Sequence, residues 1–145
     1  MYQLYKLEDV HFEKLTFKFV PEVIELLQAI SSFIPKTKNE ELFKQFISQP
    51  NVISLVAHDG NKVLGFGAMV IYSNIRGGKI GFVEDIVTHP EFRKIGIGFS
   101  VLESLRKTAI VLGCYKISLF CKDENIEFYK KCGFNLNGNE MRMQL

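Results

Sequence analysis

The sequence predicts a mixed α/β (α+β) domain in which helices flank a largely antiparallel sheet. Apolar residues recur at helical spacing in several stretches, and short β-branched runs stand between them. Turn residues separate these stretches, with an Asp-Gly pair between two apolar runs and glycines where helices should end. No repeat or linker composition interrupts this order, so we expect one domain over residues 1–145.

The first part of the chain predicts one strand followed by two helices. Alternating apolar residues predict a strand over Phe12–Val20, and Pro21 suits the first position of a helix. Apolar residues at three- and four-residue spacing continue that helix until Pro35. A second amphipathic helix over residues 42–47 ends before Pro50.

The middle of the chain predicts three consecutive strands. They cover Val52–His58, Val63–Tyr72 and Ile80–Val87. Asp59-Gly60 between the first two is a strong hairpin signal, and Gly77-Gly78 marks the next turn. Because short turns join antiparallel strands, this part forms the centre of the predicted sheet.

A helix, a strand, a short helix and a final strand complete the predicted order. The longer helix opens after Gly96 and Gly98 and ends at Gly113, which suits its C-terminal cap. The remaining elements are a strand over Lys116–Cys121, a helix over Asn125–Lys131 and a strand over Met141–Leu145.

Composition excludes several function classes. Hydrophobic residues make up 47% of the chain and charged residues 23%, which argues against intrinsic disorder. The net charge of +2 is too balanced for a protein that neutralises nucleic-acid phosphates. No apolar run approaches the ~18 residues of a membrane helix, and the first residues lack the apolar stretch of a secretory signal. We therefore expect a cytoplasmic protein without a nucleic-acid or membrane partner.

The cysteines and histidines predict neither a disulfide framework nor a metal site. Three cysteines without CxxC spacing fit a reducing compartment and are interpreted as small packing residues: Cys114, Cys121 and Cys132. The histidines lack metal-ligand spacing and are expected at the surface or in loops: His11, His58 and His89.

The clearest chemical pattern is the glycine-containing loop between the third central strand and the longer helix. Free N–H groups at a helix start favour a phosphate or pyrophosphate, and Arg93 and Lys94 add positive charge. Gly96 and Gly98 allow a ligand to approach the backbone. No Gly-Lys-Ser/Thr follows, and Val101 replaces the third glycine of a dinucleotide fingerprint. From these residues alone, a turn without a ligand remains an equal alternative.

Arg93-Lys94-Ile95-Gly96-Ile97-Gly98 resembles the R/Q-x-x-G-x-G/A motif of the GNAT acetyltransferases, whose order of elements also matches. Three further stretches are similar to the glucosamine-6-phosphate N-acetyltransferase family: Phe82–Val87, Gly113–Ile117 and Asn125–Phe134, with its N-x-x-F-Y-x-K-x-G-F pattern. The similarity is clear over Gly65–Leu145 and weaker before it. It implies the GNAT fold and direct transfer of an acetyl group from acetyl-CoA to the 2-amine of glucosamine 6-phosphate, for UDP-N-acetylglucosamine synthesis.

The resemblance assigns acetyl-CoA to the glycine-containing loop, the preceding strand end and the C-terminal helix. Loop amides would hold the pyrophosphate, and the strand backbone at a bulge would hold the pantetheine and thioester. Ile86 and Val87 equally suit a plain strand, and Asn125 equally suits a helix N-cap. The implied residues are Ile86, Val87, Thr88, Arg93, Lys94, Ile95, Gly96, Ile97, Gly98, Phe99, Asn125, Tyr129 and Lys131.

Two catalytic residues are implied in the same way. Tyr129 matches the tyrosine that faces the CoA sulfur, where a phenol can donate a hydrogen bond to the leaving thiolate; packing is the alternative. Glu84 and Asp85 match an acidic pair beside the sugar, with Asp85 touching the sugar or amine. Adjacent strand residues point to opposite faces, so both can serve only at a bulge. A solvated acidic pair is the other interpretation.

The implied substrate residues extend beyond the acidic pair. Ser31 takes the position of a substrate-contacting Thr, and Tyr115 and Lys116 match residues that help bind the sugar phosphate, often from the second subunit. Lys116 equally suits a solvated strand start. Because the family forms intertwined homodimers with C-terminal strand exchange, we expect a dimer with composite sites.

Two departures leave the acceptor open. Phe120 stands where the family has an acid that helps hold the amino sugar, and Gln144 stands where it has an arginine. Arg142 shares a strand face with Gln144 and could compensate. The alternatives are a GNAT enzyme for another small amine or a protein amine, and a non-catalytic CoA-binding module.

Overall fold

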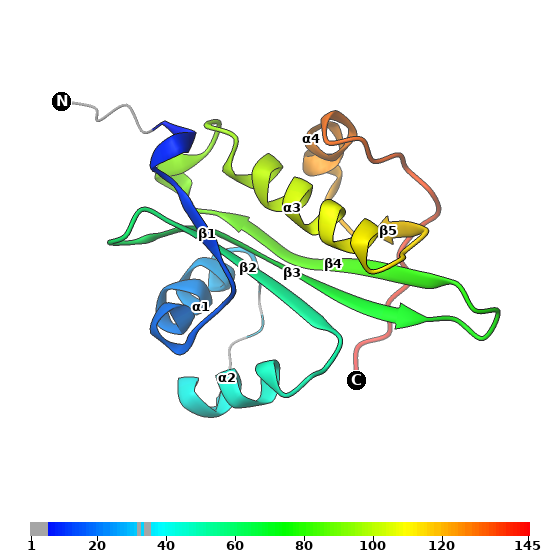
Figure 1. Cartoon of the computed structure of the whole chain (residues 1–145), viewed down its shortest axis with the longest axis horizontal. Coiled ribbons are helices and arrows are strands. Elements are labelled where there is room, and N and C mark those ends of the chain that lie inside the picture. The colour runs from blue at the N-terminus through cyan, green and yellow to red at the C-terminus, as the bar shows by residue number, and fades with distance from the viewer. Residues whose placement is uncertain (1–5, 32, 34–35) are drawn as a thin grey trace.

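The computed structural model describes residues 6–31, 33 and 36–145. At its centre lies a five-stranded sheet in the order β1-β2-β3-β4-β5, with α1 and α2 on one face and α3 and α4 on the other (Figure 1). The strands are β1 (His11–Glu13), β2 (Val52–His58), β3 (Val63–Ser73), β4 (Lys79–Thr88) and β5 (Lys116–Ser118). The helices are α1 (Val20–Gln28), α2 (Asn39–Ile47), α3 (Ile97–Val111) and α4 (Ile126–Lys131). The predicted fold class is confirmed.

The first four strands pair antiparallel, and β5 pairs parallel to β4. The parallel pair follows from the connection, because α3 carries the chain across the sheet before β5 begins. The parallel ladder is short and joins Ile80 to Lys116, Gly81 to Ile117 and Phe82 to Ser118. Beyond Phe82, β4 continues to Thr88 without β5 beside it.

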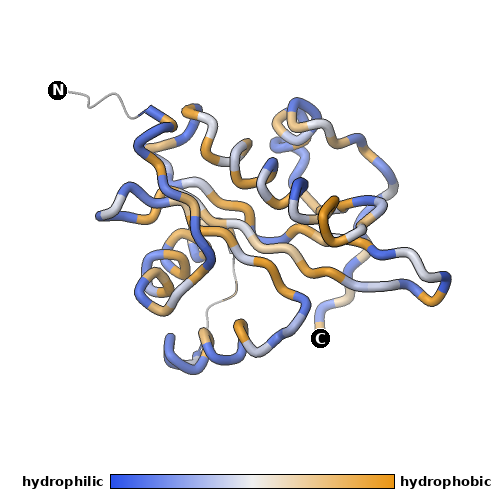
Figure 2. The backbone as a smooth tube through the Cα atoms, viewed as in Figure 1, coloured by the Kyte–Doolittle hydropathy of each residue, from blue (hydrophilic) through white to orange (hydrophobic). Residues whose placement is uncertain are grey.

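Each face of the sheet has its own apolar core. On the α3 face, Ile97, Val101 and Leu105 are at most 1% exposed and belong to one buried cluster with strand residues. On the α1 face, Val20 and Val23 pack in a second cluster that includes strand residues of β2 and β3. Figure 2 shows the apolar residues concentrated along the central strands. A one-residue slip would exchange the side chains of the two faces and disrupt the packing of both cores, so this packing fixes the register.

The predicted first strand is wrong beyond its start. The structure has a strand only at β1, followed by a 3-10 turn over Phe17–Phe19 that leads into α1. The Leu15 amide donates to the Ser54 hydroxyl at 3.2 Å, and not to a strand partner. Leu15 and Phe19 are buried all the same, so the apolar alternation reflects a turn packed into the core. Pro35, the expected end of the first helix, lies outside the described residues, and α1 ends at Gln28.

Two predictions in the second half of the chain also differ from the structure. The strand expected to reach Cys121 ends at Ser118, because the chain there diverges from β4. Residues 141–145, all described, form no strand, and Met141, Met143 and Leu145 are largely exposed. A strand needs a neighbour to take its backbone hydrogen bonds, and this tail has none within the described chain.

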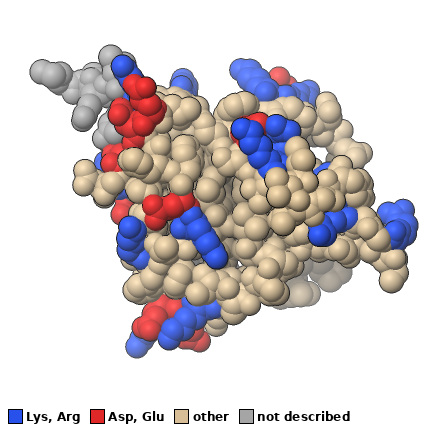
Figure 3. Space-filling view, viewed as in Figure 1, with Lys and Arg blue, Asp and Glu red and all other residues tan. Residues whose placement is uncertain are grey.

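Surface charge is mixed on the visible face. Figure 3 shows Lys and Arg in small separate groups interspersed with Asp and Glu. Across the described residues, no helix has both the length and the apolar character needed to cross a bilayer.

Candidate active site

A bulge in β4 brings two neighbouring carboxylates to one cleft. Phe66 pairs with Val87 and Ala68 with Glu84, so β4 uses one residue more than β3 between these pairs. Asp85 occupies the bulge with a φ of 58°, in the left-handed region that Asp tolerates better than most residues. The bulge that both carboxylates require is therefore present in the structure.

Gly67 on β3 makes room for this bulge. A Cβ atom at Gly67 would lie 2.7 Å from Ile86 Cδ1 and 2.6 Å from Val101 Cγ1. The missing side chain lets Ile86 pack inward against α3, while Glu84 and Asp85 remain exposed at the cleft. The hydrophobic packing beneath the sheet thus supports the conformation of the acidic pair.

The cleft opens where β4 and β5 separate. Its volume is about 330 Å³, within the range of small-molecule sites. Beyond Phe82 the facing edge of β4 has no strand partner in the described chain, so its amides and carbonyls are available to a ligand. The cleft is lined by Phe82, Val83, Glu84, Asp85, Ile86, Leu119, Phe120, Tyr129 and Arg142.

The acidic pair holds protons more tightly than free carboxyls. Partial burial in the cleft raises the pKa of Asp85 above its ordinary value. Burial, and then repulsion from Asp85, raises the pKa of Glu84. Arg142 brings a positive charge to the same cleft, and its Nη2 donates to Glu140 Oε1 at 2.6 Å. A carboxylate of raised pKa suits the acceptance of a proton from an amine.

Tyr129 supplies a hydroxyl that stays protonated. Burial, with smaller contributions from Cys121 and Cys132, raises the pKa of Tyr129 to about 12. Its ring packs edge-on against Phe128 at 5.1 Å and Phe134 at 5.8 Å between centroids. Packing therefore positions the ring, and at neutral pH the hydroxyl is a hydrogen-bond donor. The packing expected of Tyr129 is present, and its contact with the CoA sulfur stays a prediction.

The loop before α3 presents free amides at the start of a 15-residue helix. Lys94 and Gly96 both have left-handed backbone, with φ of 71° and 92°. The first bond at this end is from Ser100 N to Gly96 O at 2.9 Å. Among the described residues, the amides of residues 96–99 have no hydrogen-bond acceptor. These amides and the helix dipole make a site for an anion such as a pyrophosphate.

Gly98 joins this loop to the other two parts of the site. A Cβ atom there would lie 3.2 Å from Phe128 Cζ and 3.3 Å from Thr88 Oγ1. The start of α3, the end of β4 and α4 therefore meet at Gly98. Of the other loop residues, Ile97 is buried, Ile95 is partly buried, and Arg93, Lys94 and Phe99 are exposed.

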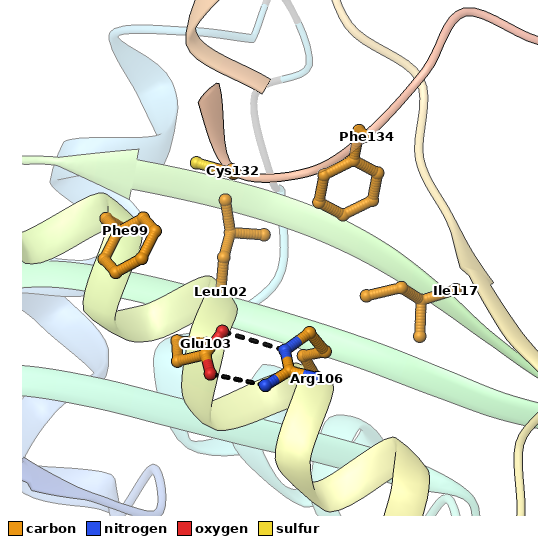
Figure 4. A pocket seen from close by; sticks show the side chains of 7 residues that line it. All are labelled: Phe99, Leu102, Glu103, Arg106, Ile117, Cys132 and Phe134. Atoms are coloured by element: carbon orange, nitrogen blue, oxygen red, sulfur yellow. Dashed lines mark hydrogen bonds and ion pairs between the residues drawn. The ribbon is translucent and has the colours of Figure 1, made fainter. Parts of the chain in front are cut away.

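A second hollow in the described structure is too small for a ligand. It lies between α3 and the segment after α4, and its volume of about 10 Å³ is that of a single water. Figure 4 shows Leu102 of α3 close to Cys132, with Phe134 from the same C-terminal segment. On the rim, Arg106 makes two hydrogen bonds of 2.8 and 2.6 Å to Glu103.

Some predicted site residues lie apart from the cleft in this one chain. Tyr115 and Lys116 sit near the β3–β4 hairpin, where the Tyr115 amide donates to Lys79 O at 3.0 Å. Ser31 follows α1, is exposed, and accepts a hydrogen bond from Phe33 N at 3.1 Å. Asn125 occupies the N-cap position of α4 that was predicted for it, but its side chain makes no capping hydrogen bond.

Two further predictions, for Cys121 and His58, differ from the structure. Cys121 is exposed and so is not the packing residue that was predicted, whereas Cys114 and Cys132 pack against the α3 core as expected. His58 is buried, not on the surface. Across the described residues, no three or more His, Cys, Asp or Glu side chains gather as a metal site would require.

The sequence reasoning missed Phe82, Val83 and Leu119 as cleft residues. Phe82 lies two positions before Glu84 and shares its strand face, so period-two alternation could have found it. Leu119 lines the cleft because β5 ends one residue earlier, a boundary that has no mark in the sequence.

The sequence profile of the Acetyltransferase (GNAT) family matches residues 20–134. The chain belongs to the GNAT acetyltransferase family. It is 34% identical over 125 residues to glucosamine 6-phosphate N-acetyltransferase 1 of Dictyostelium discoideum, covering 83% of this chain and 80% of that one. It is 32% identical over 101 residues to the Schizosaccharomyces pombe glucosamine 6-phosphate N-acetyltransferase, covering 68% and 91%.

The family's fold is confirmed by a solved structure. The crystal structure of glucosamine-6-phosphate N-acetyltransferase from Arabidopsis thaliana superimposes with a TM-score of 0.85 at 27% identity, covering 93% of this chain and 97% of that one. The family match spans α1, the whole β2–β5 sheet region, the glycine-containing loop and α4. All the cleft residues except Arg142 therefore lie within the matched range.

Proposed function

We propose that this chain transfers the acetyl group of acetyl-CoA to the 2-amine of glucosamine 6-phosphate, giving N-acetylglucosamine 6-phosphate. The observation that carries the proposal is the cleft in which an open strand edge, an acidic pair and a protonated tyrosine meet. The names of the relatives from three organisms support the acceptor. The product would feed UDP-N-acetylglucosamine synthesis in the cytoplasm.

The residues fit acetyl-CoA, which supplies an acetyl thioester activated for attack by an amine. The free amides of residues 96–99 at the start of α3 would bind the pyrophosphate, with Arg93 and Lys94 adding charge. The open edge of Ile86–Thr88 would bind the pantetheine arm. Asn125, whose side chain makes no capping bond, and Lys131 would contact the same molecule from α4.

Asp85 would accept a proton from the amine, and Tyr129 would donate a hydrogen bond toward the sulfur. An amine attacks only in its neutral form, and Asp85 would accept its proton, because a raised pKa strengthens a carboxylate as a base. Glu84 would help orient the sugar. Tyr129 keeps its proton on Oη at neutral pH and would donate a hydrogen bond on the sulfur side of the cleft.

Binding of the acceptor phosphate would require a homodimer. Tyr115 and Lys116 lie away from the cleft of their own chain, so a second copy would supply them, together with Arg142 of the cleft. Ser31 would contact the substrate from the end of α1. The exposed apolar tail supports a homodimer, because Met141, Met143 and Leu145 are 83% exposed or more and pairing with a partner would cover them.

A second acceptor class is favoured by one observation. Phe120 lines the cleft and replaces the acid that would help hold an amino sugar. An enzyme for another small amine, or for a protein amine, would need no acid at this position.

Steady-state thiol release from acetyl-CoA tests the proposal. The acceptors are glucosamine 6-phosphate, glucosamine without phosphate and a lysine peptide. We expect the highest kcat/KM with glucosamine 6-phosphate. Turnover of another amine alone would favour the second acceptor class, and acetyl-CoA binding without thiol release would favour a non-catalytic module.

A further inference from the structure

The cleft contains an aromatic pair that the chemistry of acetyl transfer leaves unused. The ring of Phe120 meets that of Phe82 at 5.1 Å between centroids and an interplanar angle of 63°. Both rings line the same cleft as the acidic pair. This pair is called the Phe82–Phe120 platform below.

The platform has a rigid base and an open top. Phe82 is half-buried in β4 and pairs in register with Ser118, the last residue of β5. Phe120 follows two residues later, where the chain leaves the sheet, and is 61% exposed. Edge-to-face contact with an anchored ring restrains Phe120 while its remaining surface stays available.

An exposed phenylalanine beside charged groups is costly unless something covers it. Leaving apolar surface in water forfeits the gain from burial, and the charged side chains of Glu84, Asp85 and Arg142 line the same cleft. A ligand with one apolar surface and several polar groups would satisfy both parts of this lining. Tyr129, the remaining aromatic of the cleft, is already packed by Phe128 and Phe134.

A pyranose ring has this character. Its C–H bonds present a weakly positive, apolar face, and an aromatic ring presents a negative face, so the two attract each other. Its hydroxyl and amino groups project from the edge, where carboxylates can receive them. A linear amine has no such face and gains nothing from an aromatic platform.

We propose that Phe120, supported by Phe82, determines acceptor specificity by stacking on the C–H face of a cyclic amino sugar. This inference rests on the proposed function and adds a residue that selects the acceptor without taking part in proton transfer. A carboxylate at residue 120 would instead add a third negative charge beside Glu84 and Asp85, which already repel each other.

Steady-state kinetics of Phe120→Ala and Phe120→Tyr test the inference, with Ile47→Ala as the matched control. Ile47 is also a half-exposed apolar residue, but it lies on α2 across the sheet from α3 and α4 (Figure 1). We expect Phe120→Ala to raise KM for glucosamine 6-phosphate roughly ten- to a hundredfold and to leave KM for acetyl-CoA unchanged. Phe120→Tyr keeps the ring and should stay close to the parent, as should Ile47→Ala.

Saturation-transfer NMR with glucosamine 6-phosphate adds a readout that needs no turnover. Saturation of the aromatic protons should pass mainly to the hydrogens on one face of the sugar ring, and Phe120→Ala should abolish this pattern. Light scattering of each variant measures whether the oligomeric state has changed.

The outcomes separate the two proposals. An unmodified chain that neither acetylates nor binds glucosamine 6-phosphate overturns the proposed function and this inference together. If the unmodified chain is active but Phe120→Ala leaves KM for the sugar unchanged, only the inference fails. It also fails if KM rises equally for acetyl-CoA, or if Phe120→Ala changes the oligomeric state, since Phe120 would then contact the cofactor or a second copy.

Discussion

Replacing Tyr129 with Phe removes one hydroxyl and keeps the ring. Packing against Phe128 and Phe134 involves only the ring, so the position of α4 should not change. Nothing in the described chain makes a hydrogen bond with the hydroxyl that is lost. We therefore expect the free energy of unfolding to change by less than about 1 kcal/mol.

The expected effect on catalysis is much larger. With a pKa of about 12, Tyr129 is almost wholly protonated at neutral pH, so every molecule of the parent enzyme carries the donor. Losing one positioned donor at the reacting centre lowers kcat by roughly a hundredfold, which is about 2.7 kcal/mol of transition-state stabilisation. KM for acetyl-CoA should stay within about threefold, because amides elsewhere bind most of that molecule.

The assay is thiol release at saturating acetyl-CoA and glucosamine 6-phosphate, followed from pH 6 to about pH 10. Tyr72→Phe is the matched control, because Tyr72 is a half-exposed tyrosine on β3 outside the cleft. An unchanged kcat for Tyr129→Phe would remove Tyr129 from the mechanism. A loss of parent activity well below pH 10 that disappears in Tyr129→Phe would contradict the high pKa.

Three further predictions concern the bulge, the loop and a buried hydrogen-bond pair. Asp85→Asn keeps a residue that tolerates left-handed backbone but should lower kcat about a hundredfold or more. Because the folded-state pKa of Asp85 lies above its ordinary 3.8, the charged carboxylate destabilises the fold at neutral pH. Thermal melting should therefore show Asp85→Asn to be the more stable protein at pH 7, with the difference vanishing below about pH 4; a variant that is less stable at pH 7 would contradict the raised pKa. Gly96→Ala should cost roughly 1–2 kcal/mol of stability and raise KM for acetyl-CoA; Gly60→Ala, with a similar φ of 94° in the β2–β3 hairpin, should cost the same and leave KM unchanged. A KM raised equally by both would argue against anion binding at the loop. We expect His58→Phe to lower the free energy of unfolding, measured in urea, by about 1–3 kcal/mol and to leave kcat unchanged. The reason is that Glu13 Oε2, at 2.8 Å, and the Gly60 amide, at 3.1 Å, both lose their hydrogen-bond partner.

The sequence predicted the parts of the fold that depend on periodicity and on glycine. The runs of β2, β3 and β4 and the apolar spacing of α3 were clear, because two-sided burial leaves a strong pattern. Gly96 is the N-cap of α3 and has a φ of 92°, a conformation that favours glycine, so its position in the sequence predicted where the helix starts.

The parts that could not be predicted depend on tertiary contacts. The φ of 58° at Asp85 leaves no mark in the sequence, since it follows from the packing of Ile86 into the space at Gly67. Apolar alternation around Leu15 predicted a strand where the structure has none. A turn packed into the core produces the same alternation, so the pattern alone does not distinguish the two. The end of β5 at Ser118 depends on where two strands part, and that separation opens the cleft.

The elements around the candidate site were easier to predict than the lining of its cleft. The loop motif and Tyr129 pointed to elements that lie together in the structure, because the start of α3, the end of β4 and α4 meet at Gly98. Phe82 lines the cleft because it shares a strand face with Glu84, and Leu119 lines it because the chain leaves β4 after Ser118. Matching single residues to a family motif reveals neither relation.

A crystal structure with CoA and N-acetylglucosamine 6-phosphate tests the central claim most directly, because it locates both products of the proposed reaction. We predict the pyrophosphate on the amides of residues 96–99, the sulfur beside the Tyr129 hydroxyl and the acetamido nitrogen beside Asp85. A sugar bound outside the cleft between β4 and β5, or a sulfur remote from Tyr129, would contradict it.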